Sequence, residues 1–389
     1  MNIGFVTRLD AFVHRGGDTV QLEQLATALR AEGHRVDVHT GTRFQLDHRW
    51  DLVHIFNLQR PGETARQVGR AAPSVPVVIS PIYGDTTGLD AQGRSLMRRV
   101  LSKVASPHLI ELGKQGRRVA RGLGELESIY PILARDPEGL RRWVLDRCRG
   151  IYPNSGWEAE GLRRYISPER VDNVEVVPNG VDVGLLERGW TGDAFRQRWG
   201  IEYDKFVLCV ARFDERKNNL ALIRAALQAD VPCVMIGRPA PLHVGYYARC
   251  RREAEAGRRV RFIDEPLSHE QLTGAYRAAH AHALPSWLET PGLVSLEAAL
   301  CGANLVLGEC PPVREYFGES AWYCDPGDVT SIATALRSAY TTERNLYNID
   351  DLVRRKYSWR QVALRQLECY ERALEARAVM EVEAIYDHS

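Results

Sequence analysis

The stretch ETPGLVSLEAALCG, residues 289–302, places two carboxylates, Glu289 and Glu297, eight residues apart around a predicted helix start. Thr290 is a favoured N-cap residue and Pro291 suits the first helical position. The glycine that closes the stretch is a favoured C-terminal cap. The pattern therefore predicts a helix that begins at Thr290 and Pro291, with Glu289 in the preceding loop and Glu297 inside the helix.

The first turn of this helix is expected to bind an anion. The amides of Gly292, Leu293 and Val294 have no partner inside the predicted helix, and the aligned peptide dipoles favour a negative charge there. Carboxylates accept strong hydrogen bonds from hydroxyl groups. The stretch thus suits a ligand with hydroxyls at both ends and phosphates between them, which is the layout of a nucleotide-sugar.

An alternative makes the two glutamates the acid and base of a glycosidase. Eight residues of helix separate two positions by roughly 12 Å at about 1.5 Å per residue. The carboxylates of glycosidases lie about 5 to 9.5 Å apart. A loop that folds back could shorten the separation, so the hydrolase remains the less favoured alternative.

Several motifs resemble those of the retaining glycosyltransferases of family 4, the group 1 glycosyltransferases, which have the GT-B fold. The E-x7-E pattern with its Ala-rich helix and Cys-Gly carries the resemblance, and other pieces follow it in order and spacing along nearly the whole chain. These pieces are Gly16-Gly17, DLVHIF at 51–56, YPNSGWEAEGL, VVPNGVD, VARFDERKNN at 210–219 and YSW at 357–359. The resemblance implies an α/β fold of two Rossmann-like domains facing across a cleft, with a C-terminal helix that crosses back to the N-terminal domain.

Length and composition agree with a two-domain enzyme. The chain has 389 residues, 44% of them hydrophobic and 26% charged, with a net charge of +1. A chain of this length is usually too long to fold around a single hydrophobic core, so two domains are expected. A domain that binds nucleic acid generally carries a marked basic excess, so the balanced charge argues against a nucleic-acid partner.

The eight cysteines are scattered without a C-x-x-C pair or a Cys/His cluster. This distribution predicts buried free thiols in a reducing compartment, with neither disulfide nor zinc framework. The N-terminus opens directly on an apolar strand, and no apolar run approaches the length of a membrane span. We therefore expect a cytoplasmic protein.

The first residues predict a β-loop-α-β unit. A strand at 2–7 leads into a loop with Gly16 and Gly17, then a helix from about Thr19 to Ala31. The chain lacks the G-x-G-x-x-G and P-loop motifs, which disfavours hydride transfer and NTP hydrolysis. Gly16 and Gly17 could form a simple flexible turn. The resemblance instead implies that the backbone here, which has no side chains, comes close to a phosphate of the donor or to the acceptor.

Candidates for the acceptor or sugar side lie near two predicted strands. His54 is inside DLVHIF, where a hydrogen-bonded core histidine is the main alternative to a catalyst. The resemblance implies a histidine just after the next strand, but this chain has SPIYGD at 80–85. Tyr83 and Asp85 are the candidates for that place.

The region 94–149 is rich in arginine and long aliphatic residues and predicts helices with one apolar and one basic face. The main interpretation is a solvated basic surface over a core. The alternative is peripheral contact with the inner face of a membrane, because basic amphipathic helices bind anionic lipid.

The second domain is expected to bind the donor. An apolar strand at 206–211 ends at Arg212, and Lys217 follows in the next loop, at the strand edge where open α/β sheets bind ligands. Both cations suit a diphosphate that gains charge as it leaves. Gly237 suits close approach of a ligand, and the resemblance implies that main-chain groups near Ile263 hold the nucleobase.

Together these features predict an N-terminal acceptor domain (1–183), a C-terminal donor domain (184–356) and a helix (357–389) that packs back on the first domain. The expected function is retaining transfer of a sugar from a nucleoside diphosphate, UDP preferred and GDP next, to a sugar or glycan acceptor in cell-envelope polysaccharide or glycoconjugate synthesis. Alternatives are a natural-product glycosyltransferase, an epimerase or phosphorylase on the same fold, and a non-catalytic sugar-nucleotide or glycan-binding subunit.

Each predicted site residue is expected to bind one part of the nucleotide-sugar. Glu289 accepts from hydroxyls of the transferred sugar and Glu297 from the ribose, while Arg212 and Lys217 bind the diphosphate. Glu289, Arg212 and Lys217 are the predicted catalytic residues. No D-x-D pair is placed to clamp a metal, so we expect activity without a metal ion or cofactor.

Overall fold

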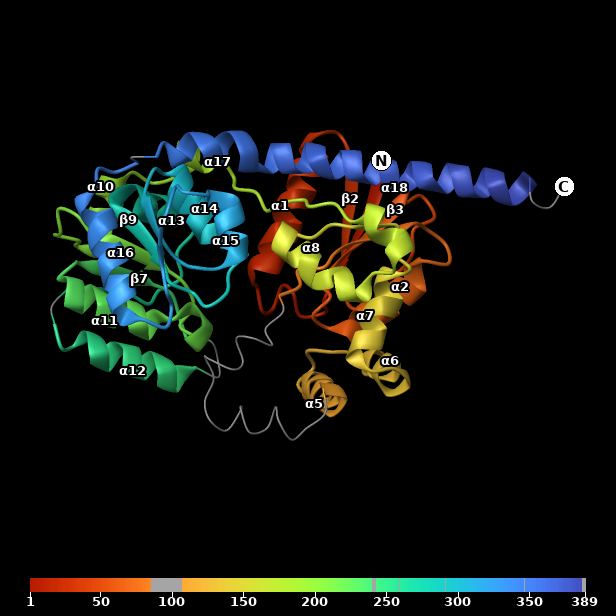
Figure 1. The fold of residues 1–389 in the computed structure, drawn as a ribbon, viewed down its shortest axis with the longest axis horizontal. Helices are drawn as coiled ribbons and strands as arrows, with labels where there is room; N and C mark the ends of the chain where they lie inside the picture. The colour runs from red at the N-terminus through yellow and green to blue at the C-terminus, as the bar shows by residue number, and fades with distance from the viewer. Residues whose placement is uncertain (85–106, 240–242, 258, 291, 346, 387–389) are drawn as a thin grey trace. The chain divides into compact units, whose positions relative to one another are not determined.

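The computed structural model describes residues 1–84, 107–239, 243–257, 259–290, 292–345 and 347–386. These residues form two compact units (Figure 1). Unit 1 contains the described residues up to Asn179 together with those from Trp359 onward, and unit 2 contains Gly180–Ser358. The predicted domain boundaries were residues 183 and 356.

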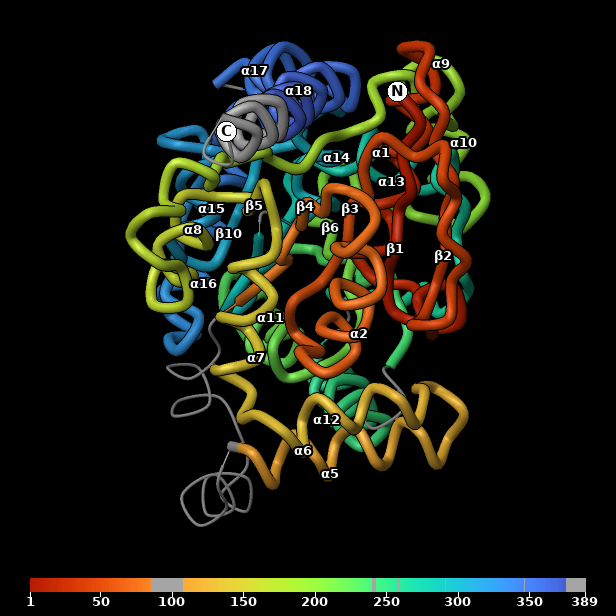
Figure 2. The backbone as a smooth tube through the Cα atoms, turned by 90° about the vertical axis from the view of Figure 1, so that its right-hand side faces the viewer, coloured from red at the N-terminus to blue at the C-terminus, as the bar shows by residue number. Residues whose placement is uncertain are grey.

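A five-stranded parallel sheet forms the centre of unit 1, in the order β2-β1-β3-β4-β5 (Figure 2). The strands are β1 Asn2–Thr7, β2 Arg35–Thr40, β3 Leu52–Phe56, β4 Val77–Ser80 and β5 Gly150–Ile151. Strands β3 and β4 are buried along their whole length, as expected for continuous apolar runs in a parallel sheet covered on both faces. The strand predicted at 2–7 is confirmed.

Helices complete unit 1. They are α1 Gly17–Ala31, α2 Pro61–Ala71, α5 Pro107–Ala120, α6 Tyr130–Ala134, α7 Pro137–Leu145, α8 Gly156–Leu162 and α18 Trp359–Tyr386. Helix α1 begins two residues before the predicted Thr19, because Gly16 in extended conformation serves as its N-cap. Helix α18 runs along α1, where Arg360 donates to Glu32 at 2.8 Å, so the last helix belongs to unit 1.

A six-stranded parallel sheet forms the centre of unit 2, in the order β11-β10-β9-β6-β7-β8. The strands are β6 Val207–Val210, β7 Cys233–Ile236, β8 Val260–Ile263, β9 Ala281–Leu284, β10 Asn304–Gly308 and β11 Trp322–Cys324. The chain adds β7 and β8 on one side of β6, then crosses to add β9, β10 and β11 on the other. The strand order therefore reverses between β6 and β9, and such switch points are where open sheets bind ligands at the carboxyl ends of the strands.

The helices of unit 2 pack on both faces of its sheet, over two buried apolar clusters. They are α9 Leu185–Arg188, α10 Gly192–Trp199, α11 Asn219–Ala229, α12 Val244–Ala254, α13 His269–Ala278, α14 Leu293–Leu300, α15 Pro311–Phe317, α16 Val329–Thr341 and α17 Ile349–Tyr357. Among the described helices of both units, none has the length and apolar character that crossing a membrane requires.

All eight cysteines are free thiols, as predicted, and all but the half-buried Cys301 are buried. Burial raises the pKa of thiols such as Cys209 and Cys324 to about 12, which disfavours the reactive thiolate.

Candidate active site

Two loops meet at the switch point of the unit 2 sheet. The loop after β6 contains a short 3-10 helix, η4 Glu215–Lys217, capped by Asp214, whose carboxylate accepts from the Lys217 amide at 3.0 Å. The loop after β9 is tied to it, because Trp287 donates its amide to the Arg216 carbonyl at 3.0 Å. Asn218 adds a side-chain bond to the carbonyl of Pro285 at 3.2 Å. Parallel pairing of β6 with β9 thus fixes the two loops side by side.

Lys217 and Glu289 form an ion pair between these loops, with the ammonium donating to Oε2 of the carboxylate. Their side chains are only 13% and 12% exposed. Burial alone would raise the pKa of Glu289, but the charges of Lys217 and Arg216 and the hydrogen bond from Lys217 lower it below its usual value. Glu289 is therefore an ionised carboxylate at neutral pH.

The same loop carries two further cations, one of which, Arg216, acts on Glu289 through its charge. Arg212 and Arg216 are exposed, and neither has an ion-pair partner in the part of the chain that the structure describes. Both come from the loop at the carboxyl end of β6, where an anionic ligand would bind. No group of three or more His, Cys, Asp or Glu residues gathers as a metal site among the described residues.

Helix α14 begins later than the sequence predicts. Its first residue is Leu293 and its N-cap is Gly292, so the predicted start at Thr290 is wrong, while Pro291 lies outside the described residues. Gly292 has φ 82°, which takes the chain out of helical conformation at this point. A Cβ there would lie 2.9 Å from Cγ of Glu289, so this glycine also makes room for the carboxylate.

The first turn of α14 presents two of the three amides that the sequence analysis expects to bind an anion. The Ser295 amide donates to the Gly292 carbonyl at 2.8 Å. Leu293 and Val294 are the first two helical residues, whose amides have no partner within a helix. They lie four and five residues after Glu289, so the expected anion seat involves Leu293 and Val294, with Gly292 serving as the cap.

Glu297 is held by a residue that the sequence analysis missed. Tyr276 of α13 donates its hydroxyl to Oε2 at 2.9 Å, and Nδ1 of His269 lies 3.8 Å from Oε1. Burial raises the pKa of Glu297, although His269 and Tyr276 act in the opposite direction. Nothing in the sequence around Tyr276 distinguishes it from a core tyrosine, so only the packing of α13 on α14 identifies its role.

Gly237 and Ile263 lie at the carboxyl ends of β7 and β8. Gly237 has φ 150°, and a Cβ there would be 2.0 Å from the carbonyl oxygen of Ala211, so its primary role is close packing of the backbone at the end of β6. Ile263 is 4% exposed and contributes its side chain to the core. Its carbonyl accepts from the Gly237 amide at 3.3 Å, so the main chain is the part of Ile263 at the sheet edge.

The glycine pair of unit 1 lies at the start of α1. Gly16 is its N-cap, and a Cβ there would be 2.8 Å from a carboxylate oxygen of Asp18, whereas no atom lies within 4 Å of a Cβ built on Gly17. Arg8, which is 8% exposed, donates to Asp18 at 2.6 Å and to Asp10 at 2.7 Å. This buried arginine fixes the loop that carries the glycines.

His54 is a core histidine, so its placement on the acceptor side is wrong. It is completely buried, with Nε2 2.9 Å from the Ser80 hydroxyl and Nδ1 2.5 Å from the Tyr370 hydroxyl. Burial lowers its pKa to about 3, which keeps the ring neutral. Its two partners join β3 to β4 and to α18.

Tyr83 also lies largely inside unit 1, at 8% exposure. Its hydroxyl is 3.2 Å from that of Tyr165 and accepts from Arg164 at 3.0 Å, and burial raises its pKa to about 12. The Tyr83 hydroxyl, the group predicted to contact a sugar, is therefore already hydrogen-bonded within unit 1. Asp85, the other candidate, lies outside the described residues.

The basic region is described from residue 107 onward, and 94–106 lie outside the described residues. Several of its arginines make contacts within unit 1: Arg141 lies 5.4 Å from the ring of Tyr83, and Arg118 pairs with Glu111 at 3.5 Å. Exposed apolar residues occur beside them at Leu109, Leu126, Tyr130 and Leu133. Contact with a membrane stays a prediction.

Comparison with known proteins identifies relatives of part of this chain. Residues 192–352 match the family described as glycosyl transferases group 1. D-inositol 3-phosphate glycosyltransferase of Mycolicibacterium smegmatis is 31% identical over 209 residues, which cover 52% of this chain and 48% of that protein. The serotype-specific mannosyltransferase WbdA of Escherichia coli is 28% identical over 182 residues, 44% of this chain and 22% of WbdA. The chain thus spans about half or less of these relatives.

Solved structures resemble the whole chain in fold. Sucrose-phosphate synthase from Thermosynechococcus elongatus has a TM-score of 0.67 at 18% identity, covering 97% of this chain and 100% of the other. HepE of Anabaena, in complex with UDP and glucose, has a TM-score of 0.66 at 16% identity, covering 95% and 99%. The predicted α/β fold of two Rossmann-like domains, the GT-B fold, is confirmed.

Proposed function

Because residues 192–352 match the group 1 glycosyl transferases, we propose that the protein is a retaining glycosyltransferase that moves a sugar from a nucleoside diphosphate to an acceptor hydroxyl. The Lys217–Glu289 pair at the switch point carries the proposal. It sets a carboxylate suited to sugar hydroxyls beside an ammonium suited to a diphosphate, at the sheet edge where such folds bind ligands.

Negative charge grows on the leaving diphosphate as the glycosidic bond breaks. Lys217 and Arg212 supply positive charge there, and the first amides of α14 supply N–H donors. An ammonium has three N–H donors, so Lys217 can keep Glu289 in place while it binds a phosphate oxygen. Glu289, held ionised, accepts hydrogen bonds from the hydroxyls of the transferred sugar.

Glu297 is proposed to accept from the ribose hydroxyls. Tyr276 already occupies Oε2, which orients the carboxylate and directs Oε1 to the ligand. Main-chain groups at Ile263 are proposed to hold the base, with UDP preferred and GDP next. A structural neighbour solved with UDP and glucose, HepE, supports the preference for UDP.

We propose a front-face reaction for the transfer. The acceptor oxygen bonds to the anomeric carbon on the side from which the diphosphate leaves, and the hydroxyl proton passes to the leaving phosphate oxygen. The configuration at the anomeric carbon is retained without a protein nucleophile. The cations of the site take the place of a metal ion, so activity should persist in EDTA.

The proposed acceptor is a sugar or glycan in polysaccharide or glycoconjugate synthesis. The names of two relatives, one acting on D-inositol 3-phosphate and one a mannosyltransferase, support this class. We retain Gly16 and Gly17 of unit 1 as the predicted acceptor or donor contact, because Gly17 leaves open space beside the backbone.

The test is release of nucleoside diphosphate with and without acceptor. UDP-, GDP- and ADP-sugars are first ranked by the thermal stabilisation that each gives the protein. The donor that stabilises most is then incubated with inositol phosphate, with mono- and oligosaccharides and with small aglycones. The Glu289→Gln variant is the control. We expect release that requires an acceptor and is lost in the variant. Isomerised donor without acceptor would instead identify an epimerase, and donor binding without release would identify a binding subunit.

A further inference from the structure

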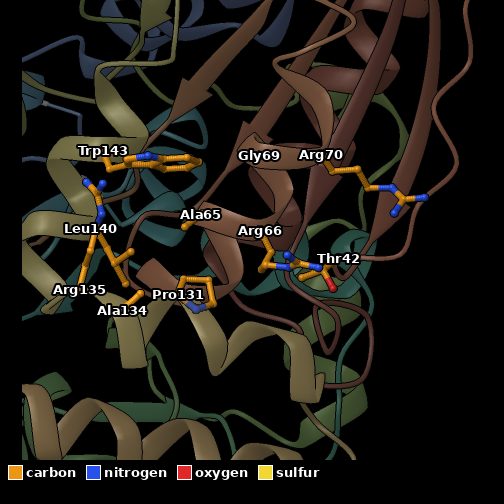
Figure 3. A pocket seen from close by; sticks show the side chains of 10 residues that line it. All are labelled: Thr42, Ala65, Arg66, Gly69, Arg70, Pro131, Ala134, Arg135, Leu140 and Trp143. Atoms are coloured by element: carbon orange, nitrogen blue, oxygen red, sulfur yellow. The ribbon is translucent and has the colours of Figure 1, made fainter.

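Unit 1 contains a pocket of about 490 Å³ between α2, α6, α7 and the segment that follows β2 (Figure 3). A volume of this size is within the range of about 300 to 1,000 Å³ that is usual for small-molecule sites. Its lining residues are Thr42, Ala65, Arg66, Gly69, Arg70, Pro131, Ala134, Arg135, Leu140 and Trp143.

The walls combine an apolar surface with positive charge on two sides. Figure 3 shows Arg66 beside Thr42 on one side and Arg135 beside Trp143 on the other, while Arg70 points away from them. Between the two sides lie small apolar residues and Leu140. Such a cavity suits a ligand that has an apolar body and a negative group.

The Arg135 guanidinium is available to an anion. The side chain is exposed, and it has no ion-pair partner in the part of the chain that the structure describes. Arg66 pairs with Glu127 at 3.1 Å, but this carboxylate also pairs with Arg43 at 3.1 Å. Arg66 therefore shares its counter-ion and keeps N–H donors for a second acceptor.

Thr42 is a buried part of the pocket wall. It is 2% exposed, and its hydroxyl has no hydrogen-bond partner among the described residues. Buried hydroxyls are nearly always paired, because leaving one unpaired destabilises the folded protein. The hydroxyl itself has almost no accessible surface, so Thr42 contributes the rest of its side chain to the wall on the Arg66 side.

Gly69 keeps the pocket open. It lies inside α2, where glycine is less favourable than alanine. A Cβ at this position would be 3.4 Å from Cη2 of Trp143, so alanine would fit in ordinary contact but would fill space in front of the indole. The glycine thus leaves the ring accessible to a ligand.

We propose that this pocket binds a small amphiphilic anion, that is, a carboxylate, sulfonate or phosphate group on an apolar ring or short chain. The negative group contacts Arg135, and the apolar part packs on Trp143 and Leu140 beside it, while Arg66 and Thr42 form the opposite wall. All of these residues belong to unit 1, whereas the proposed donor-binding cations belong to unit 2. The pocket is therefore a second site, whose ligand need not be the donor.

The test is calorimetric titration of the full chain with 1-naphthyl phosphate, with excess UDP present to occupy the donor site. The variants are Arg135→Glu, Gly69→Leu and Thr42→Val, with Arg142→Glu as the matched control. Arg142 is an exposed arginine of α7 outside the pocket. Lys217→Ala is the control for binding at the donor site.

We expect one equivalent of 1-naphthyl phosphate to bind wild type, Arg142→Glu and Lys217→Ala equally. Arg135→Glu should weaken binding at least roughly tenfold, because a charge-assisted contact is replaced by repulsion. Gly69→Leu should abolish binding, and Thr42→Val, on the opposite wall, should leave it nearly unchanged. The neutral analogue 1-naphthalenemethanol should not bind measurably.

The proposal fails if wild type does not bind the probe, if Arg135→Glu binds as tightly as Arg142→Glu, or if the neutral analogue binds equally well. Circular dichroism checks that Gly69→Leu is folded. If it is not, Gly69→Ala and Arg135→Glu decide, since an alanine fits beside Trp143 and residue 135 is exposed.

Discussion

The ammonium of Lys217 donates to the carboxylate of Glu289, 72 residues further along the chain. The two residues meet because the loops that carry them follow β6 and β9, which are neighbours at the point where the strand order reverses. In the free protein the charge of Lys217 therefore stabilises the ionised form of Glu289, in the position proposed for the diphosphate and the sugar.

Removing one member of this pair should destabilise the protein more than removing both. Lys217→Met leaves a largely buried carboxylate unpaired, which is expected to lower the free energy of unfolding by about 3 kcal/mol. Lys217→Met/Glu289→Gln removes both charges and should recover part of that loss. Urea denaturation of both single variants and the double variant gives the coupling energy. Strictly additive effects would mean that the pair contributes no interaction.

The glycine before α14 should matter for activity as well as for stability. Alanine at Gly292 is strained at φ 82° and brings a methyl group within 2.9 Å of Cγ of Glu289, so the carboxylate must move. A displacement near 1 Å can reduce turnover roughly 100-fold. We expect Gly292→Ala to lower kcat/KM by about that factor.

Gly318→Ala is the matched control for that variant. Gly318 also has positive φ, 51°, but no atom lies within 4 Å of its Cβ position. Both variants should lose thermal stability, and only Gly292→Ala should lose activity. Equal activity of the two would show that Gly292 does not position Glu289.

Tyr276 should act on donor affinity rather than on the chemical step. Tyr276→Phe removes the hydroxyl that holds Oε2 of Glu297, and loss of a hydrogen bond to a charged group is expected to raise the KM for donor about tenfold at constant kcat. The pKa of Glu297 should rise further, since the Tyr276 bond lowers it. Tyr323→Phe, whose hydroxyl donates to the Gly318 carbonyl at 2.6 Å, is the control and should leave KM unchanged. A fall in kcat alone would contradict this role.

Glu158 should make stability depend on pH. Burial raises its pKa from 4.5 to about 7, although the amides of Tyr83 and Asn154, at 2.6 and 2.7 Å, act against the rise. The folded state then binds the proton more tightly than the unfolded state. The free energy of unfolding should fall as pH rises from about 4.5 to about 7, by roughly 3 kcal/mol in total, and then level off.

Urea denaturation between pH 5 and pH 8 measures this dependence as the difference between wild type and Glu158→Gln, in which it should be absent. Glu160→Gln, an exposed position on the same helix, should keep the wild-type profile. A Glu158→Gln profile that parallels wild type would show that this carboxyl does not titrate in that range.

Most of the helices and strands could be predicted from local sequence patterns. The strand at 2–7 was predicted from its apolar run. The end of the helix before Gly302 was predicted from the glycine, which in the structure has a left-handed conformation with φ 72°. Lys217 and Glu289 could each be named from their motifs. Their direct contact could not, because it depends on the order of strands in the sheet, which local sequence does not encode.

Other features depend on tertiary packing in the same way. Helix α14 begins at Leu293 rather than at the predicted Thr290, because Gly292 adopts a positive φ beside Glu289. Capping preferences alone do not predict this conformation. Tyr276 and Glu158 carry no motif, and only burial and geometry identify them. His54 was open between two interpretations, and its bonds to Ser80 and Tyr370 identify it as core.

Calorimetric titration with UDP and GDP tests the central claim most directly, because it asks whether Lys217 of unit 2 binds a nucleoside diphosphate. Wild type and Lys205→Ala, an exposed lysine of the same unit, should bind one of the two with the same affinity. Lys217→Ala should weaken that binding by roughly 10- to 100-fold, as expected for loss of a charge-assisted contact. Binding of neither nucleotide by wild type, or equal affinity in Lys217→Ala, would contradict the account.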